Sequence, residues 1–162
     1  MTVTNIEKDL DALTMTVNAE FDATVERTWQ LWSDPRQLER WWGPPTHPAT
    51  VVDHDLAPGA LVTYFITGPD GDRYHGWWRI IAVDAPHALE VEDGFADETG
   101  RPNDEMPNTN MTVTLSARVD GGTRVKIVSR FSSRDAMEQL MNMGMDEGLN
   151  AAMSQMDAIV TG

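Results

Sequence analysis

The chain has 162 residues, no cysteine and a formal net charge of −14, which comes from 26 acidic and 12 basic side chains. The absence of cysteine excludes disulfides and thiolate metal ligands, and the negative charge disfavours nucleic acid and anionic membrane surfaces as partners. Because no stretch approaches the ~20 apolar residues of a membrane span and the first residues lack the pattern of a signal peptide, we expect one cytoplasmic domain over residues 1–162.

The N-terminal part of the chain predicts one strand after a loosely ordered extension of residues 1–10. From Leu13 to Phe21 the odd positions are apolar and the even positions are polar. This period of two is typical of a strand with one face in water. We therefore take residues 13–21 as the first strand of a sheet.

Two short helices are expected between the first and the second strand. Thr24 can cap the first of them, which ends where a proline follows Asp34. Asp34 can cap the second helix, with that proline at its first position. Gly43 and two prolines end this helix directly after Trp41 and Trp42. We expect these tryptophans to close the open end of a curled sheet.

Six further strands follow, separated by turns that are rich in glycine, proline and aspartate. Four precede a long acidic loop over residues 94–108, and two come after it. The expected segments are 49–55, 60–67, 73–83, 88–93, 111–119 and 125–131. Trp77 and Trp78 are neighbours in one strand and therefore point to opposite faces. The pattern does not tell which of the two faces inward.

Residues 133–159 predict one long amphipathic helix, opened by serines that can cap it. Its apolar side is expected to be buried and carries Met137, Met141, Met145, Gly148, Ala152, Met156 and Ile159. This is the one expected element long enough to cover an antiparallel sheet of seven strands. The sheet would curl around the helix.

Four segments in this order resemble a known family. They are "WSDPRQLERWWGP" at 32–44, "APGALVTYFITGPDG" at 57–71, "EDGFADETGRPNDEMP" at 92–107 and "SRFSSRDAMEQLMNMGMDEGLNAAMSQMD" at 129–157. With the order of elements, they resemble the SRPBCC or START-like superfamily, and within it the activator of Hsp-90 ATPase homologue-like family. The chain departs from the family pattern at Ala60–Val62 and at Leu149, where many members carry an aromatic ring.

The resemblance implies an α+β helix-grip fold: a seven-stranded curved antiparallel sheet wrapped around a long C-terminal helix, with a cavity between them. It implies a protein that binds a small hydrophobic or amphipathic ligand there, with lipid binding and the stress response among the associated roles. By family register and alternation, the expected pocket residues are Trp42, Val62, Tyr64, Ile66, Trp78, Phe95, Val113, Leu115, Met141, Met145 and Leu149.

Other functions stay open at this point. The family name suggests an interaction protein with a chaperone partner, and a homodimer is also open. Superfamily relatives include cyclases and dehydratases that act on polyketide-like substrates, and His75 with Tyr74 and Arg79 could supply an acid and a base. We nevertheless assign no catalytic residue.

No metal site and no cofactor are expected. The acidic loop lacks the residue order of a calcium loop, and in the "DHD" segment Asp53 and His54 point to opposite faces of a strand. We instead expect the loop to act as a lid over the cavity, with Phe95 at the mouth.

Overall fold

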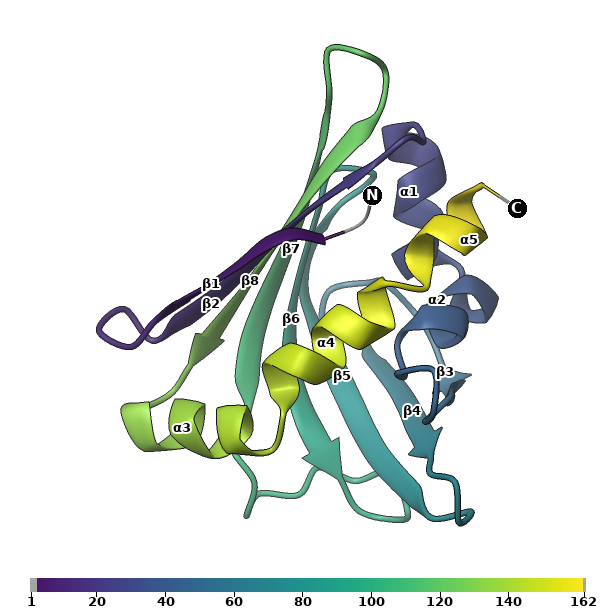
Figure 1. The fold of residues 1–162 in the computed structure, drawn as a ribbon. Helices are drawn as coiled ribbons and strands as arrows, with labels where there is room; N and C mark the ends of the chain where they lie inside the picture. The colour runs from purple at the N-terminus through teal and green to yellow at the C-terminus, as the bar shows by residue number, and fades with distance from the viewer. Residues whose placement is uncertain (1–2, 162) are drawn as a thin grey trace.

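The computed structural model describes residues 3–161 and shows one curved sheet with helices on one of its faces (Figure 1). The strands are β1 (Val3–Asp9), β2 (Thr14–Phe21), β3 (Ala49–Asp53), β4 (Leu61–Thr67), β5 (Arg73–Asp84), β6 (Ala88–Ala96), β7 (Thr109–Ala117) and β8 (Thr123–Phe131). The helices are α1 (Val25–Ser33), α2 (Pro35–Trp41), α3 (Arg134–Asn142), α4 (Met145–Met153) and α5 (Met156–Val160). None of the described helices is long and apolar enough to cross a membrane.

The sheet is antiparallel throughout and has eight strands in the order β1-β2-β8-β7-β6-β5-β4-β3. The predicted fold class is confirmed, with a correction in the number of strands. The additional strand is β1, which pairs with β2 from Asn5↔Asn18 to Asp9↔Thr14. The expectation of a loosely ordered extension is therefore wrong for residues 3–9, whereas residues 1–2 lie outside the described residues. An edge strand needs only backbone partners, so β1 forms without the apolar alternation that reveals a strand in the sequence.

The two short helices lie where the sequence predicts them, between β2 and β3. The hydroxyl of Thr24 accepts a hydrogen bond from the backbone N–H of Arg27 at 3.1 Å and begins α1. The carboxylate of Asp34 accepts one from the N–H of Arg36 at 2.9 Å and begins α2. Both caps satisfy backbone donors that a helix start leaves unpaired.

The C-terminal segment differs from the single long helix that its periodicity predicts. Ser133 caps α3 as expected, accepting from the N–H of Ala136 at 3.0 Å. The helix then stops, because Gly144 adopts a left-handed conformation with a φ of 84°. Figure 1 shows α3 turning away from the line of α4 and α5, which cross the open side of the sheet. The break lets the segment follow a curved surface that one straight rod could not follow.

Tryptophans form the centre of the core. Trp32, Trp41 and Trp78 are fully buried, and the indole N–H of Trp41 donates to the carbonyl of Leu31 at 2.8 Å. The ring centroids of Trp32 and Trp41 lie 5.4 Å apart, and those of Trp41 and Trp42 lie 5.5 Å apart. Both pairs have edge-on geometry. Edge-on pairs of this kind add to the stabilisation that burial gives. The tryptophans thus connect α1 and α2 to the sheet.

The structure also decides the orientation of the adjacent tryptophans in β5. Trp78 lies on the helix-covered face, within the hydrophobic core. Trp77 lies on the opposite face, where its indole N–H donates to the carbonyl of Phe95 at 2.9 Å and the guanidinium of Arg79 lies 5.5 Å from its ring. Both rings are buried, so burial alone did not distinguish them.

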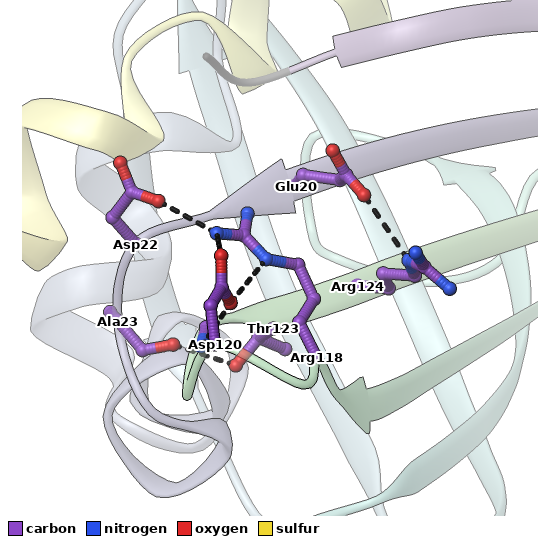
Figure 2. A network of polar contacts seen from close by, with 8 residues as sticks. Glu20, Asp22, Ala23, Arg118, Asp120, Thr123 and Arg124 are labelled. Carbon is purple, nitrogen blue, oxygen red and sulfur yellow. Dashed lines mark hydrogen bonds and ion pairs between the residues drawn. The ribbon is translucent and has the colours of Figure 1, made fainter.

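A polar network fixes α1 to the end of the sheet where β7 turns into β8 (Figure 2). Arg118 donates to Asp22 at 2.9 Å and to Asp120 at 2.6 Å. The buried hydroxyl of Thr123 donates to the carbonyl of Ala23 at 2.7 Å. These contacts join the β7–β8 turn to the segment between β2 and α1.

Candidate functional site

A cavity of about 290 Å³ lies between the helix-covered face of the sheet and the α3–α4 segment. Its walls come from the end of α2, from β4 to β8, and from the region around the helix break. Most of the wall is apolar. Gly144 and Gly148 help to form it, and a Cβ atom added at either glycine would meet no atom within 4 Å. On β7 the cavity is bordered by Thr109 and Met111, near the start of the strand, so it lies at the opposite end of β7 from the Arg118 network.

Six of the eleven predicted pocket residues border this cavity. They are Trp42, Tyr64, Ile66, Phe95, Met145 and Leu149. Phe95 lies at the end of β6, just before the acidic loop, and Pro107 from the end of that loop also borders the cavity. The role of the loop as a lid stays a prediction.

Five predicted residues lie elsewhere. Val62 and Trp78 are fully buried in the core, and the ring of Trp42 contacts Trp78. Val113 and Leu115 are buried farther along β7, on which α1 packs. Met141 is partly buried and packs against the core. Alternation identified the inward face of β4 and β7 but not that of β5, and α1 and the tryptophans fill part of the inward face.

Asp93 is the ionisable residue of this wall that the sequence reasoning missed as a site residue. We expected β6 to end at Asp93, but the strand continues to Ala96, so Val91, Asp93 and Phe95 share the helix-covered face. The spacing of Val91, Asp93 and Phe95 by two residues each already indicated in the sequence that the three share one face of a strand. The glycine after Asp93 made the strand appear to stop.

The carboxyl group of Asp93 occupies an unusual environment. One side of it faces the cavity, and protein atoms surround much of the rest, so the residue is half-buried. Burial raises the pKa of Asp93 to about 7, whereas hydrogen bonds from Tyr64 and from the Gly94 backbone act in the opposite direction. At neutral pH this group therefore exists as both acid and carboxylate.

Tyr64 lies beside this carboxyl group. Its hydroxyl donates to Oδ1 of Asp93 over a long 3.4 Å, so the hydrogen bond is weak. Burial, and then the nearby Asp93 charge, raise the pKa of Tyr64 well above its ordinary value, so the phenol stays protonated. Gly76 makes this position possible, because a Cβ there would collide with the Tyr64 ring.

Two buried polar atoms on residues that border the cavity lack a hydrogen-bond partner within the described part of the protein. They are Oγ of Ser129, a residue only 1% exposed, and the indole N–H of Trp42. The N–H of Trp42 is near enough to the Tyr64 hydroxyl to lower the pKa of that phenol, but the contact does not have the geometry of a hydrogen bond. Unpaired buried polar groups are costly, and protein atoms cover both of these groups, so neither is open to the cavity.

The acid–base group considered from the sequence is not brought together. Tyr74 lies opposite Ile66, whereas the His75 ring packs against Phe65 at 5.6 Å. Arg79 forms a 3.3 Å ion pair with Glu92, away from the cavity. Neighbouring residues of a strand point to opposite faces, which separates Tyr74 from the other two.

Within residues 3–161, no group of three or more histidine, aspartate or glutamate side chains is placed to hold a metal ion. Two of the three "DHD" residues, Asp53 and His54, have structural partners instead. Nε2 of His54 forms a hydrogen bond with the carbonyl of Trp32 at 2.9 Å, and Asp53 accepts one from Thr63 at 2.8 Å.

A curved antiparallel sheet that holds C-terminal helices across its open face, with a cavity between the two layers, defines a helix-grip protein. Residues 22–161 match the family model described as Activator of Hsp90 ATPase homolog 1-like protein, and the chain belongs to this family. The resemblance of the four sequence segments is thereby confirmed.

Solved structures agree with this assignment. The chain is similar to a Mycobacterium smegmatis protein in its crystal structure, with 53% identity over 97% of this chain and 96% of the other and a TM-score of 0.89. It is also similar to an Arthrobacter aurescens protein in its solution structure, with 48% identity over 99% and 92% of the two chains and a TM-score of 0.94. No curated protein matches the chain.

Proposed function

We propose that this protein binds a small apolar or amphipathic molecule in the cavity between the sheet and the α3–α4 segment, without covalent chemistry. The observation that carries the proposal is a cavity with a largely apolar wall that also includes the half-buried Asp93. Ligand sites usually combine an apolar lining with a few polar groups that orient the ligand. The volume, about 290 Å³, lies at the small end for such sites.

Methionine and glycine residues near the helix break support the same function. Met143 and Met145 flank the helix break, and both border the cavity. Methionine is flexible and polarisable, so these side chains can adapt to ligands of different shape. The two glycines of α4 and its cap leave space that any larger residue would fill.

Tryptophan fluorescence and thermal unfolding test the proposal with an uncharged probe such as phenylbutanol. Because the Trp42 ring borders the cavity, binding changes the tryptophan emission, and a ligand at about 100 times its Kd stabilises the fold by roughly 2.7 kcal/mol. Probes too large for the cavity serve as the control and leave both signals unchanged. If a series of uncharged probes of graded size changes neither signal, the proposal is wrong.

An acid–base enzyme of cyclase or dehydratase type is a second candidate, favoured by one observation. Asp93 has a pKa raised to about 7 by burial and faces the cavity beside Tyr64, as a general acid or base would. Polyketide-like substrates in which a hydroxyl is eliminated or a ring is closed are the compounds to test. Turnover that Asp93→Asn abolishes supports this function, and binding without turnover supports the first one.

A homodimer, a chaperone partner, a role in the stress response and a cytoplasmic location stay predictions. For the chaperone, the family description provides the reason to test it. Capture from a lysate with the protein as bait, followed by identification of a chaperone, is the direct experiment.

A further inference from the structure

We infer that the ligand of this cavity carries a positively charged amine, which the Asp93 carboxylate and the surrounding aromatic rings recognise. The inference rests on the proposed ligand-binding function and adds the chemical class of the ligand.

The charged groups at the cavity give the first argument. Asp93 is the one acidic residue among the described residues that border it, and no lysine or arginine is among them. His75 also borders the cavity, but its ring packs against Phe65. A ligand ammonium group gives Asp93 the counterion that the protein itself does not supply. A ligand carboxylate would instead place a second negative charge beside Asp93, which is unfavourable away from bulk water.

The aromatic side chains give the second argument. Trp42, Tyr64, Tyr74 and Phe95 all border the same cavity as Asp93. The rings of Trp42 and Tyr64 lie 5.8 Å apart in edge-on geometry, and both residues border the cavity. The faces of aromatic rings attract cations, and the attraction is stronger where water is excluded. Several aromatic rings around one carboxyl group are the combination that binds alkylated amines.

The charge of the whole protein acts in the same direction. A net charge of −14 attracts cations and repels anions at long range. This attraction is not specific, so an experiment has to separate it from recognition inside the cavity.

Three probes with the same apolar part separate the possibilities: phenylbutylamine, phenylbutanol and phenylbutyrate, each titrated by calorimetry into the unmodified protein. We expect the amine to bind roughly tenfold more tightly than the alcohol, or better, because hydrogen bonds to a charged partner are the strong ones. We expect phenylbutyrate to bind most weakly.

The pH dependence gives a second readout on the same protein. The amine needs the ionised form of Asp93, whose pKa is about 7, so its affinity rises from pH 6 to pH 7 and levels off above that range. Tyr64 stays protonated over this range. The other titratable residues that border the cavity are Tyr74 and His75, and the ring of His75 packs against Phe65. The affinity for the alcohol stays constant.

Asp93→Asn removes the charge and keeps the shape, so it abolishes the preference for the amine while the alcohol still binds. Glu92→Gln is the matched control, because it removes the same net charge one residue away in β6, at a side chain that pairs with Arg79. Equal binding of amine and alcohol, or an equal loss of preference in both variants, overturns the inference and leaves the ligand-binding function standing. Failure of all three probes to bind overturns both.

Discussion

The ring of Trp42 meets the ring of Trp78 edge-on, with centroids 4.9 Å apart and planes at 88°. Trp42 directly follows α2, and Trp78 is in β5, so this contact joins the second helix to the centre of the sheet. One side of Trp42 also borders the cavity. The same residue thus closes the hydrophobic core and forms part of the candidate ligand site.

Replacing Trp42 therefore affects both stability and binding. Trp42→Ala removes its contacts with Trp41, Trp78 and Tyr64. Trp42 is partly buried and packs against the core, so we expect the free energy of unfolding to fall by up to ~3 to 5 kcal/mol, the range for large aromatic residues of a core. Urea denaturation measures this loss. Trp42→Phe keeps an aromatic ring and should lose less than half as much, and a loss below about 1 kcal/mol in Trp42→Ala would contradict this assignment.

Gly148→Leu tests whether the cavity is the ligand site. A Cβ at this position meets no atom within 4 Å, and Gly148 borders the cavity, so the leucine side chain occupies space that a ligand needs. Leucine also favours helix over glycine, so stability should stay unchanged or rise by up to about 1 kcal/mol. Binding of phenylbutanol, followed by calorimetry, should weaken at least tenfold.

Asn150→Leu is the control for this filling variant. Asn150 is exposed on the same helix, so the same side chain is added away from the cavity. The control should bind phenylbutanol as the unmodified protein does. Undiminished binding by Gly148→Leu would place the ligand elsewhere.

Asp93 also makes stability depend on pH in an unusual direction. Its pKa is raised from 3.8 to about 7, so between these values the folded protein holds the proton more tightly than the unfolded chain does. This contribution to stability is fully present below pH 3.8 and is lost as the pH rises toward 7. The slope is no more than about 1.4 kcal/mol per pH unit, and smaller because part of the side chain faces the cavity.

Comparison with Asp93→Asn isolates this effect from the other carboxylates, several of which have lowered pKa values. Denaturation of both proteins at pH 5 and pH 7 gives the difference in unfolding free energy. The unmodified protein should lose stability relative to the variant as the pH rises. A difference that does not change with pH would show that Asp93 has an ordinary pKa.

Thr123 tests the network at the other end of the sheet. Thr123→Val keeps the shape but leaves the Ala23 carbonyl without the 2.7 Å hydrogen bond, so we expect a loss of about 1 to 2 kcal/mol in unfolding free energy. Binding of phenylbutanol should not change, because the cavity lies at the other end of the strands. Thr114→Val, at an exposed position with a long 3.4 Å contact, is the control and should cost little. If Thr123→Val weakened the binding of phenylbutanol as much as Gly148→Leu does, the polar network and the cavity would not be independent of each other.

Local patterns in the sequence predicted much of this structure. The alternation of β2 and β8, the caps at Thr24, Asp34 and Ser133, and the family segments are present as expected. The alternation of β7 is present as far as Leu115, but the strand ends at Ala117 and Val119 is exposed beyond it. These features depend on residues close together in the chain, so the sequence states them directly. The same reasoning located Trp42, Tyr64 and Phe95 at the cavity wall.

Long-range packing decided the rest. The alternation of β7 indicated that Val113 faces inward, but only the packing of α1 on β7 makes Val113 part of the hydrophobic core and not of the cavity wall. The left-handed turn at Gly144 and the strand β1 depend on the curvature of the sheet and on the free edge of β2, neither of which a local pattern describes. Asp93 reaches the cavity because β6 continues past it, held by backbone pairing with β5. Alternation in the sequence determined the inward face of β2, β4 and β8 but not that of β5. The tertiary structure determined which part of the inward face stays open, because helices distant in the chain fill the remainder.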